Sequence, residues 1–142
     1  MRMLDGPIAL LPCVSLNYYA PCEECDESNC TIKPVVEKGR EIRRGAPYFE
    51  EGSNVNFVEK VNDNTFAIRT YERGVEDETL SCGTGATAVA LAMHKTGVTI
   101  AQSLNVLVEG GQLTVSFHAG DNAYTNIDLQ GPATFVFEGE IA

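Results

Sequence analysis

The sequence predicts an α+β fold in which a curved, mainly antiparallel sheet wraps around one buried central helix. Residues 86–93 are almost all small or apolar and present no polar face, which is typical of a helix buried on every side. Before and after this run, pairs of alternating segments flank short turn sequences, which is typical of β-hairpins. With 142 residues, 44% of them hydrophobic, the chain is long enough for a single domain with its own core.

Residues 1–32 form an atypical, cysteine-rich segment of this single domain, 1–142. We expect a buried strand over 4–15 and an acidic loop over 18–29. Four thiolates are a zinc ligand set, but the spacing contains only one CxxC, and the acidic neighbours disfavour thiolates without a metal. Four reduced cysteines without a metal are therefore expected, and a zinc site stays as an alternative. The four are Cys13, Cys22, Cys25 and Cys30.

The next elements are a helix and a hairpin. Pro34 near a first turn and the following apolar positions predict a helix over 35–44, which Gly45 ends. Residues 55–61 and 65–71 alternate in polarity around a turn sequence of Asn, Asp and Asn. Alternation of this kind predicts an antiparallel hairpin.

The second half of the chain also predicts a helix and paired strands. The central helix should begin after Cys82, run to about Lys95 and stop at Gly97. A second hairpin with a Gly-Gly turn is expected over 103–109 and 112–118. Two further strands are then expected, over 124–129 and 133–138.

The net charge of the chain limits the classes of partner that are expected. The net charge is −10, from 20 acidic and 10 basic residues, and phosphate binding needs basic clusters, so nucleic acid is not expected. The one dense basic group comprises Arg40, Arg43 and Arg44. It has acidic neighbours, so we interpret it as a solvated helix face. No apolar stretch has the length of a membrane span, and prolines and Asp5 interrupt the only segment that resembles a signal peptide. A cytoplasmic protein is expected.

Cys82 is the strongest candidate for chemistry. It stands at the expected start of the central helix, where the dipole and the free N–H groups favour thiolate over thiol. The same N–H groups can receive a substrate carboxylate. Free cysteines are also often inert and buried, but Gly83, Gly85 and the polar neighbour Thr84 favour catalysis over simple packing.

Three other polar residues have two interpretations each. Glu72 and Arg73 follow a strand and could hold the ammonium and carboxylate of an amino acid, or form a surface ion pair of small effect. Asn54 could bind a carboxylate or an amine through its amide, or be a simple turn residue before a strand. From chain position alone the turn interpretation of Asn54 is favoured.

Residues 71–86, with the sequence YERGVEDETLSCGTGA, closely resemble the second catalytic motif of the diaminopimelate epimerase family. The segment NVNFV at 54–58 resembles an upstream substrate-binding segment, and GPATFVFEG at 131–139 is similar to the family's C-terminal ending. The resemblance runs from about Lys38 to the end, and no family element is recognised in residues 13–31. Proline racemases share a similar Cys-Gly-Thr-Gly element but match less well around Glu72.

The resemblance implies a cofactor-independent and metal-independent isomerase of lysine and peptidoglycan precursor synthesis. Such enzymes convert LL-diaminopimelate to the meso form, with two cysteines on opposite faces of the α-carbon. By resemblance Cys82 is one acid/base thiol, and five further residues bind the substrate. Glu72 and Arg73 contact it, Asn54 reaches its distal end, and Gly83 and Thr84 bind its carboxylate.

The family has two lobes with one catalytic cysteine each, and this chain resembles the C-terminal lobe alone. No Cys-Gly-Asn-Gly element for the second thiol is present. The isolated chain is therefore expected to be inactive or impaired, with a homodimer or a second lobe as its partner. The alternative is a non-catalytic amino-acid-binding or assembly module.

Overall fold

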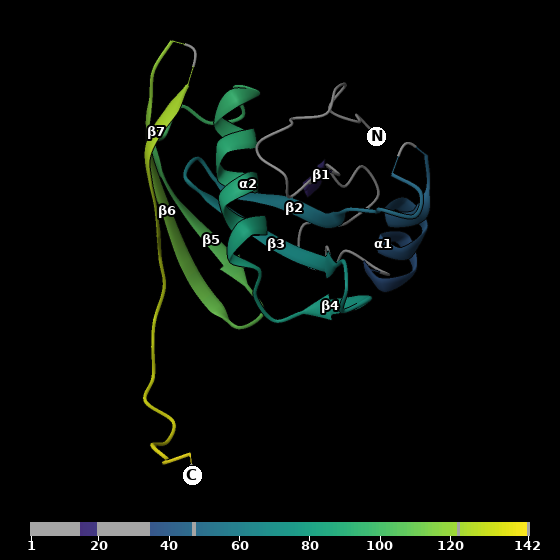
Figure 1. The fold of residues 1–142 in the computed structure, drawn as a ribbon. Helices are drawn as coiled ribbons and strands as arrows, with labels where there is room; N and C mark the ends of the chain where they lie inside the picture. The colour runs from purple at the N-terminus through teal and green to yellow at the C-terminus, as the bar shows by residue number, and fades with distance from the viewer. Residues whose placement is uncertain (1–14, 20–34, 47, 122, 142) are drawn as a thin grey trace.

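The computed structural model describes residues 15–19, 35–46, 48–121 and 123–141 (Figure 1). Within this part no helix is long and apolar enough to cross a membrane. The elements are β1 (Ser15–Tyr19), α1 (Val35–Arg44), β2 (Asn54–Asn62), β3 (Thr65–Glu72), β4 (Asp77–Thr79), α2 (Gly83–Lys95), β5 (Ser103–Val108), β6 (Gly111–Ala119) and β7 (Tyr124–Gln130). From α1 to β7 the elements follow the predicted order, except that β4 was not predicted.

The strands form one mixed, mostly antiparallel sheet in the order β1-β2-β3-β5-β6-β7, with β4 added beside β3. Both predicted hairpins are confirmed, since β2 pairs with β3 and β5 with β6 in antiparallel fashion. Two pairs, β1 with β2 and β3 with β5, are parallel. The β3–β5 pairing is parallel because the chain between them crosses over through α2, as a parallel connection requires.

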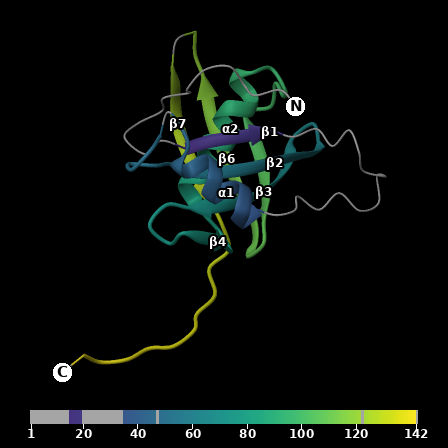
Figure 2. The same ribbon diagram turned by 90° about the vertical axis from the view of Figure 1, so that its right-hand side faces the viewer.

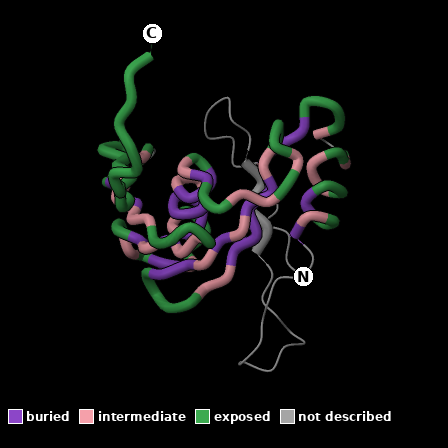
Figure 3. The backbone as a smooth tube through the Cα atoms, turned by 90° about the horizontal axis from the view of Figure 1, so that it is seen from below, coloured by how far each residue is buried: buried purple, intermediate pink, exposed green. Residues whose placement is uncertain are grey.

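The predicted central helix is confirmed as α2, and the sheet bends around it (Figures 1 and 2). Its small and apolar side chains pack against the sheet residues of the main core, and Figure 3 shows buried residues concentrated there. Gly97 adopts a left-handed φ of 75° and ends the helix, as predicted. The buried helix residues are Gly85, Ala86, Val89, Ala90, Leu91, Ala92 and Met93.

The helix α1 covers the opposite face of β2 and β3 (Figure 2). Alternate strand residues point to opposite faces, so Val55 and Tyr71 pack under α1 while Val58 and Ile68 join the α2 core. The α1 helix can come this close because Gly39 lies directly on Tyr71, where no Cβ would fit. The α1 bounds match the predicted 35–44.

The predicted strand over 133–138 is wrong. Residues 131–141 form no strand, are exposed, and run away from the sheet after β7 (Figure 1). Apolar composition favours a strand, but a strand also needs a neighbour for its backbone hydrogen bonds. No strand of the described region pairs with this tail.

The N-terminal predictions are tested only in part. β1 occupies Ser15–Tyr19, so the expected loop over 18–29 begins two residues too early. The expected strand over 4–15 shares only Ser15 with β1, and the rest of that prediction lies outside the described residues. So do Cys13, Cys22, Cys25 and Cys30.

Replacement of Gly39 by alanine tests the close approach of α1. Alanine in a helix interior should add about 1 kcal/mol of stability. Its Cβ would instead collide with the Cβ and Cγ of Tyr71, which cannot swing aside. We expect a net loss of about 1–2 kcal/mol in urea unfolding, because overpacking outweighs propensity. Arg40→Ala, on the exposed neighbour, is the control and should change stability by less than about 0.5 kcal/mol.

Candidate active site

The sulfur of Cys82 caps the N-terminus of α2. Cys82 has an extended backbone (φ −130°, ψ 104°), and its Sγ accepts a hydrogen bond from the Gly85 amide at 3.4 Å. The Thr84 hydroxyl lies 3.4 Å from the same sulfur. The side chain is 6% exposed and forms no disulfide. The sulfur therefore lies where the N–H groups of a first helical turn stabilise negative charge.

Asn54 connects Cys82 to the end of β3. Its Nδ2 donates to Cys82 Sγ at 3.8 Å, and its Oδ1 accepts from the backbone amide of Arg73 at 2.8 Å. Asn54 is only 7% exposed, so its side-chain amide makes both contacts in the protein interior. The interpretation of Asn54 as a simple turn residue misses both contacts.

Gly85 allows the first turn of α2 to touch the sheet. A Cβ at Gly85 would lie 2.5 Å from Asn56 Oδ1. Asn56 is fully buried in β2, and its Oδ1 also accepts from the Thr70 hydroxyl at 2.8 Å. Gly85 and this buried polar pair thus set the distance between the helix N-terminus and the sheet.

Glu72 lies on the same side of the sheet as Cys82. It follows Thr70 by two residues in β3, and Thr70 faces Asn56 beneath α2. Among the described residues, Glu72 and Arg73 form no ion pair with each other. Arg73 is exposed, and its guanidinium donates to the Glu51 carbonyl at 3.0 Å. Glu72 makes no side-chain hydrogen bond with another described residue.

The segment that carries Cys82 is held from two sides. The carbonyl of Leu80 accepts from the Gly110 amide at 2.8 Å, in the turn between β5 and β6. On the other side, the Arg69 guanidinium and the Glu78 carboxylate form a forked ion pair that ties β4 to β3. The pKa of Arg69 is raised, chiefly by this hydrogen bond to Glu78.

The structure brings most of the predicted site residues together. Hydrogen bonds link Asn54, Arg73, Cys82 and Thr84 directly, and Glu72 immediately precedes Arg73. Gly83 opens α2, and a Cβ there would lie 2.9 Å from the Leu129 side chain of β7. The sequence interpretation missed Asn56, although an Asn two residues after Asn54, between the apolar Val55 and Phe57, was a signal for it.

The described residues contain no group of three metal-ligating side chains.

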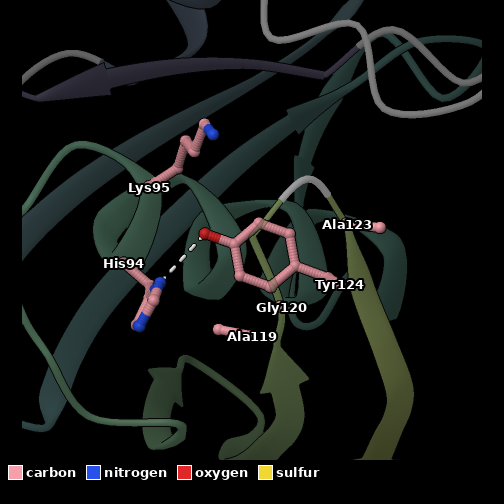
Figure 4. Close-up of a pocket in the computed structure, with 6 residues that line it drawn as sticks. All are labelled: His94, Lys95, Ala119, Gly120, Ala123 and Tyr124. Carbon is pink, nitrogen blue, oxygen red and sulfur yellow. Dashed lines mark hydrogen bonds between the residues drawn. The ribbon is translucent and has the colours of Figure 1, made fainter.

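A small pocket of about 200 Å³ lies at the other end of α2, lined by His94, Lys95 and Tyr124 among others (Figure 4). His94 Nδ1 and the Tyr124 hydroxyl are hydrogen-bonded at 2.9 Å, and burial raises the pKa of Tyr124. None of the predicted site residues lines this pocket.

A family model described as diaminopimelate epimerase matches residues 17–136. The chain belongs to the diaminopimelate epimerase family. The diaminopimelate epimerase of Flavobacterium psychrophilum is 49% identical over 128 residues, which cover 90% of this chain and 50% of that protein. The diaminopimelate epimerase of Aquifex aeolicus is 39% identical over 127 residues, which cover 89% of this chain and 43% of that protein.

Solved structures support the fold. A hydroxyproline epimerase from Agrobacterium vitis superposes with a TM-score of 0.57 at 14% identity, over 82% of this chain and 38% of that one. A phenazine biosynthesis PhzF-family protein from Enterococcus faecalis gives a TM-score of 0.51 at 17% identity, over 78% and 35%. These distant proteins share the epimerase-type fold.

The extent of the family match corrects one expectation. The match begins at residue 17, so it is wrong that the similarity starts near Lys38 and that residues 13–31 share nothing with the family. The match therefore includes residues 17–19 of β1, which lies beside β2, although no short motif marks this segment. The chain spans about half the length of its curated relatives, or less.

The contact between Thr84 and Cys82 predicts a change in thiol reactivity. Thr84→Val should slow alkylation of Cys82 by iodoacetamide roughly three- to tenfold at fixed pH, because a hydroxyl that stabilises charged sulfur is lost. Mass spectrometry of the Cys82 peptide separates this thiol from the other four. Thr87→Val is the matched control, since the Thr87 hydroxyl donates to the Gly83 carbonyl rather than to sulfur. Equal rates in the Thr84 variant and the unaltered protein would show that the hydroxyl does not act on the sulfur.

Proposed function

We propose that this chain supplies one catalytic half of a diaminopimelate epimerase, with Cys82 as one of the two acid/base groups. The observation that carries the proposal is the cluster of donors at Cys82 Sγ at the start of α2. This cluster adjoins Glu72 and Arg73, the residues proposed to contact substrate. The family membership supports an epimerase role for the cluster.

The proposed chemistry begins with the Cys82 thiolate. It removes the α-proton of a bound amino acid and becomes a thiol, and the electron pair left on the α-carbon delocalises into the carboxylate. Amide N–H groups at the start of α2, including those of Gly83 and Thr84, stabilise that developing charge. Inversion then requires a proton from an acid on the opposite face of the carbon.

A second acid/base thiol would come from outside the described part of this chain. Within that part Cys82 is the one free cysteine. Since the chain spans about half of its relatives, we propose that the opposite thiol belongs to a second lobe, in the same longer protein or in another chain. Glu72 and Arg73 would hold the ammonium and carboxylate of diaminopimelate, and Asn54 would face its distal end.

The one-base proposal predicts exchange without inversion. When LL- and meso-diaminopimelate are tested separately in D₂O, the isolated chain should place deuterium on the α-carbon of only one stereoisomer, with retained configuration. The reason is that the Cys82 thiol faces one side of the carbon, exchanges with solvent and returns a deuteron to that same side. Mass spectrometry and chiral chromatography of the recovered amino acid measure exchange and inversion separately. Rapid conversion between the LL and meso forms would contradict the missing second acid.

Two variants control this experiment. Cys82→Ser should abolish exchange, because a serine hydroxyl is far less acidic than a thiol. A variant with alanine at Cys13, Cys22, Cys25 and Cys30 should keep the exchange. If it loses exchange instead, the N-terminal segment supplies a catalytic thiol. Thermal unfolding of both variants checks that the fold is retained.

A second candidate function is an amino-acid-binding or assembly module that forms a homodimer. The exposed apolar tail favours it, since Phe135, Val136 and Phe137 are each at least 80% exposed. Large apolar patches on a protein surface mark sites of association. A second copy or a second lobe would cover this tail, and retained ligand binding without exchange in both unaltered protein and Cys82→Ala would favour the module.

The tail also predicts the association state. Phe135→Ser combined with Phe137→Ser should shift the isolated chain towards a monomer in sedimentation equilibrium, because two large apolar side chains leave the contact. Ile100→Ser is the matched control, since Ile100 is 92% exposed but lies away from the tail, between α2 and β5. An unchanged mass for the double variant would exclude the tail as the contact.

A further inference from the structure

Arg43 of α1 and Glu76 of the turn after β3 form an ion pair at 2.6 Å. The sequence interpretation placed Arg43 on a solvated helix face, but its side chain is only 11% exposed, so that interpretation is wrong for Arg43. We propose that this pair positions the turn that presents Glu72 and Arg73 to the substrate. The inference rests on the proposed function of that turn.

Glu76 closes the turn through its backbone. It adopts a left-handed φ of 62°, which is uncommon for a residue other than glycine. Its amide donates to the Glu72 carbonyl at 2.8 Å, so the two ends of the turn are joined. A backbone in this conformation persists where the surroundings hold it in place.

The Glu76 carboxylate makes several of the contacts that hold this turn in place. It accepts from the Gly74 amide at 3.1 Å and from the Tyr71 hydroxyl at 3.3 Å, in addition to Arg43. The Arg44 guanidinium lies 3.9 Å away. The Gly74 amide first, and Arg43 after it, lower the pKa of Glu76, so the carboxylate is charged at neutral pH.

Arg43 extends the support to the strand that begins with Asn54. Gly52 has a left-handed φ of 60°, and the Arg43 guanidinium occupies the space where its Cβ would be. Arg43 Nε is buried without a hydrogen-bond partner among the described residues, although buried donors are usually paired.

The ion pair therefore links the two chain segments that border the site. One segment leads through Gly52 to Asn54, and the other carries Glu72 and Arg73. The Arg73 amide already bonds to Asn54 Oδ1, so a shift of this turn would move the substrate-binding residues relative to Cys82. Arg43 and Glu76 are thus positioning residues, which act on a substrate through their neighbours.

The test compares Glu76→Gln with Asp63→Asn. Asp63 also has a lowered pKa from an ion pair, with Lys60, but it lies in the β2–β3 turn at the far end of the hairpin. LL-diaminopimelate is titrated as a protectant of Cys82 against iodoacetamide. We expect Glu76→Gln to raise the half-protecting concentration about tenfold. The alkylation rate without ligand should stay unchanged, because the Gly85 amide and the Thr84 hydroxyl of α2 still contact the sulfur. Asp63→Asn should change neither quantity.

Hydrogen–deuterium exchange of the same proteins reports on the turn itself. Glu76→Gln should speed exchange in a peptide spanning 72–76 and leave a peptide from α2 unchanged. If Glu76→Gln fails to fold, Arg43→Lys replaces it, since lysine keeps the charge but loses the planar fork. We expect Arg43→Lys to weaken protection in the same direction.

The outcomes separate the two proposals. Unchanged exchange and unchanged protection in the folded variant overturn the positioning role alone. If diaminopimelate fails to protect Cys82 even in the unaltered protein, the proposed function fails, and the role of the pair in substrate binding fails with it. Faster exchange together with unchanged protection reduces the pair to a local structural contact and also overturns the inference.

Discussion

The contact between the first turn of α2 and the middle of the sheet is the constraint on which the rest of the site depends. A helix apolar on all sides has to be enclosed, and this one lies so close to β2 that only glycine fits at position 85. The same contact brings the helix N-terminus, with its unpaired N–H groups, to the ends of β2 and β3. Cys82 caps that terminus, so packing of the core and placement of the sulfur have a single cause.

The polar residues beneath α2 give this packing its specificity. Asn54 and Asn56 point from β2 towards the helix, and both are buried. A register shift of one residue would turn them to the face covered by α1. There they would lose their contacts with Cys82 and Thr70, which leaves buried amides unsatisfied. The geometry at the sulfur is therefore tied to the register of the β2–β3 hairpin.

Sequence patterns were sufficient where the information is local. Alternation around short turns predicted both hairpins, and the apolar run with its glycines predicted α2 and its cysteine cap. Contacts between distant segments were not predictable in this way. Arg43 looked solvated because nothing near it in the chain shows that Glu76 lies opposite. The apolar residues 133–138 predicted a strand, but no local pattern shows whether a neighbouring strand is present.

The parallel pairing of β3 with β5 has a consequence for how the site forms. The chain between these strands contains the Glu72–Glu76 turn, β4, Cys82 and α2. Closing this connection costs entropy that is recovered only when β5 aligns beside β3 and α2 packs against the face of the sheet. The residues around the sulfur thus lie inside one long crossover, and its closure brings the end of β3 and the start of α2 together. Formation of the core and assembly of the site are one cooperative folding event.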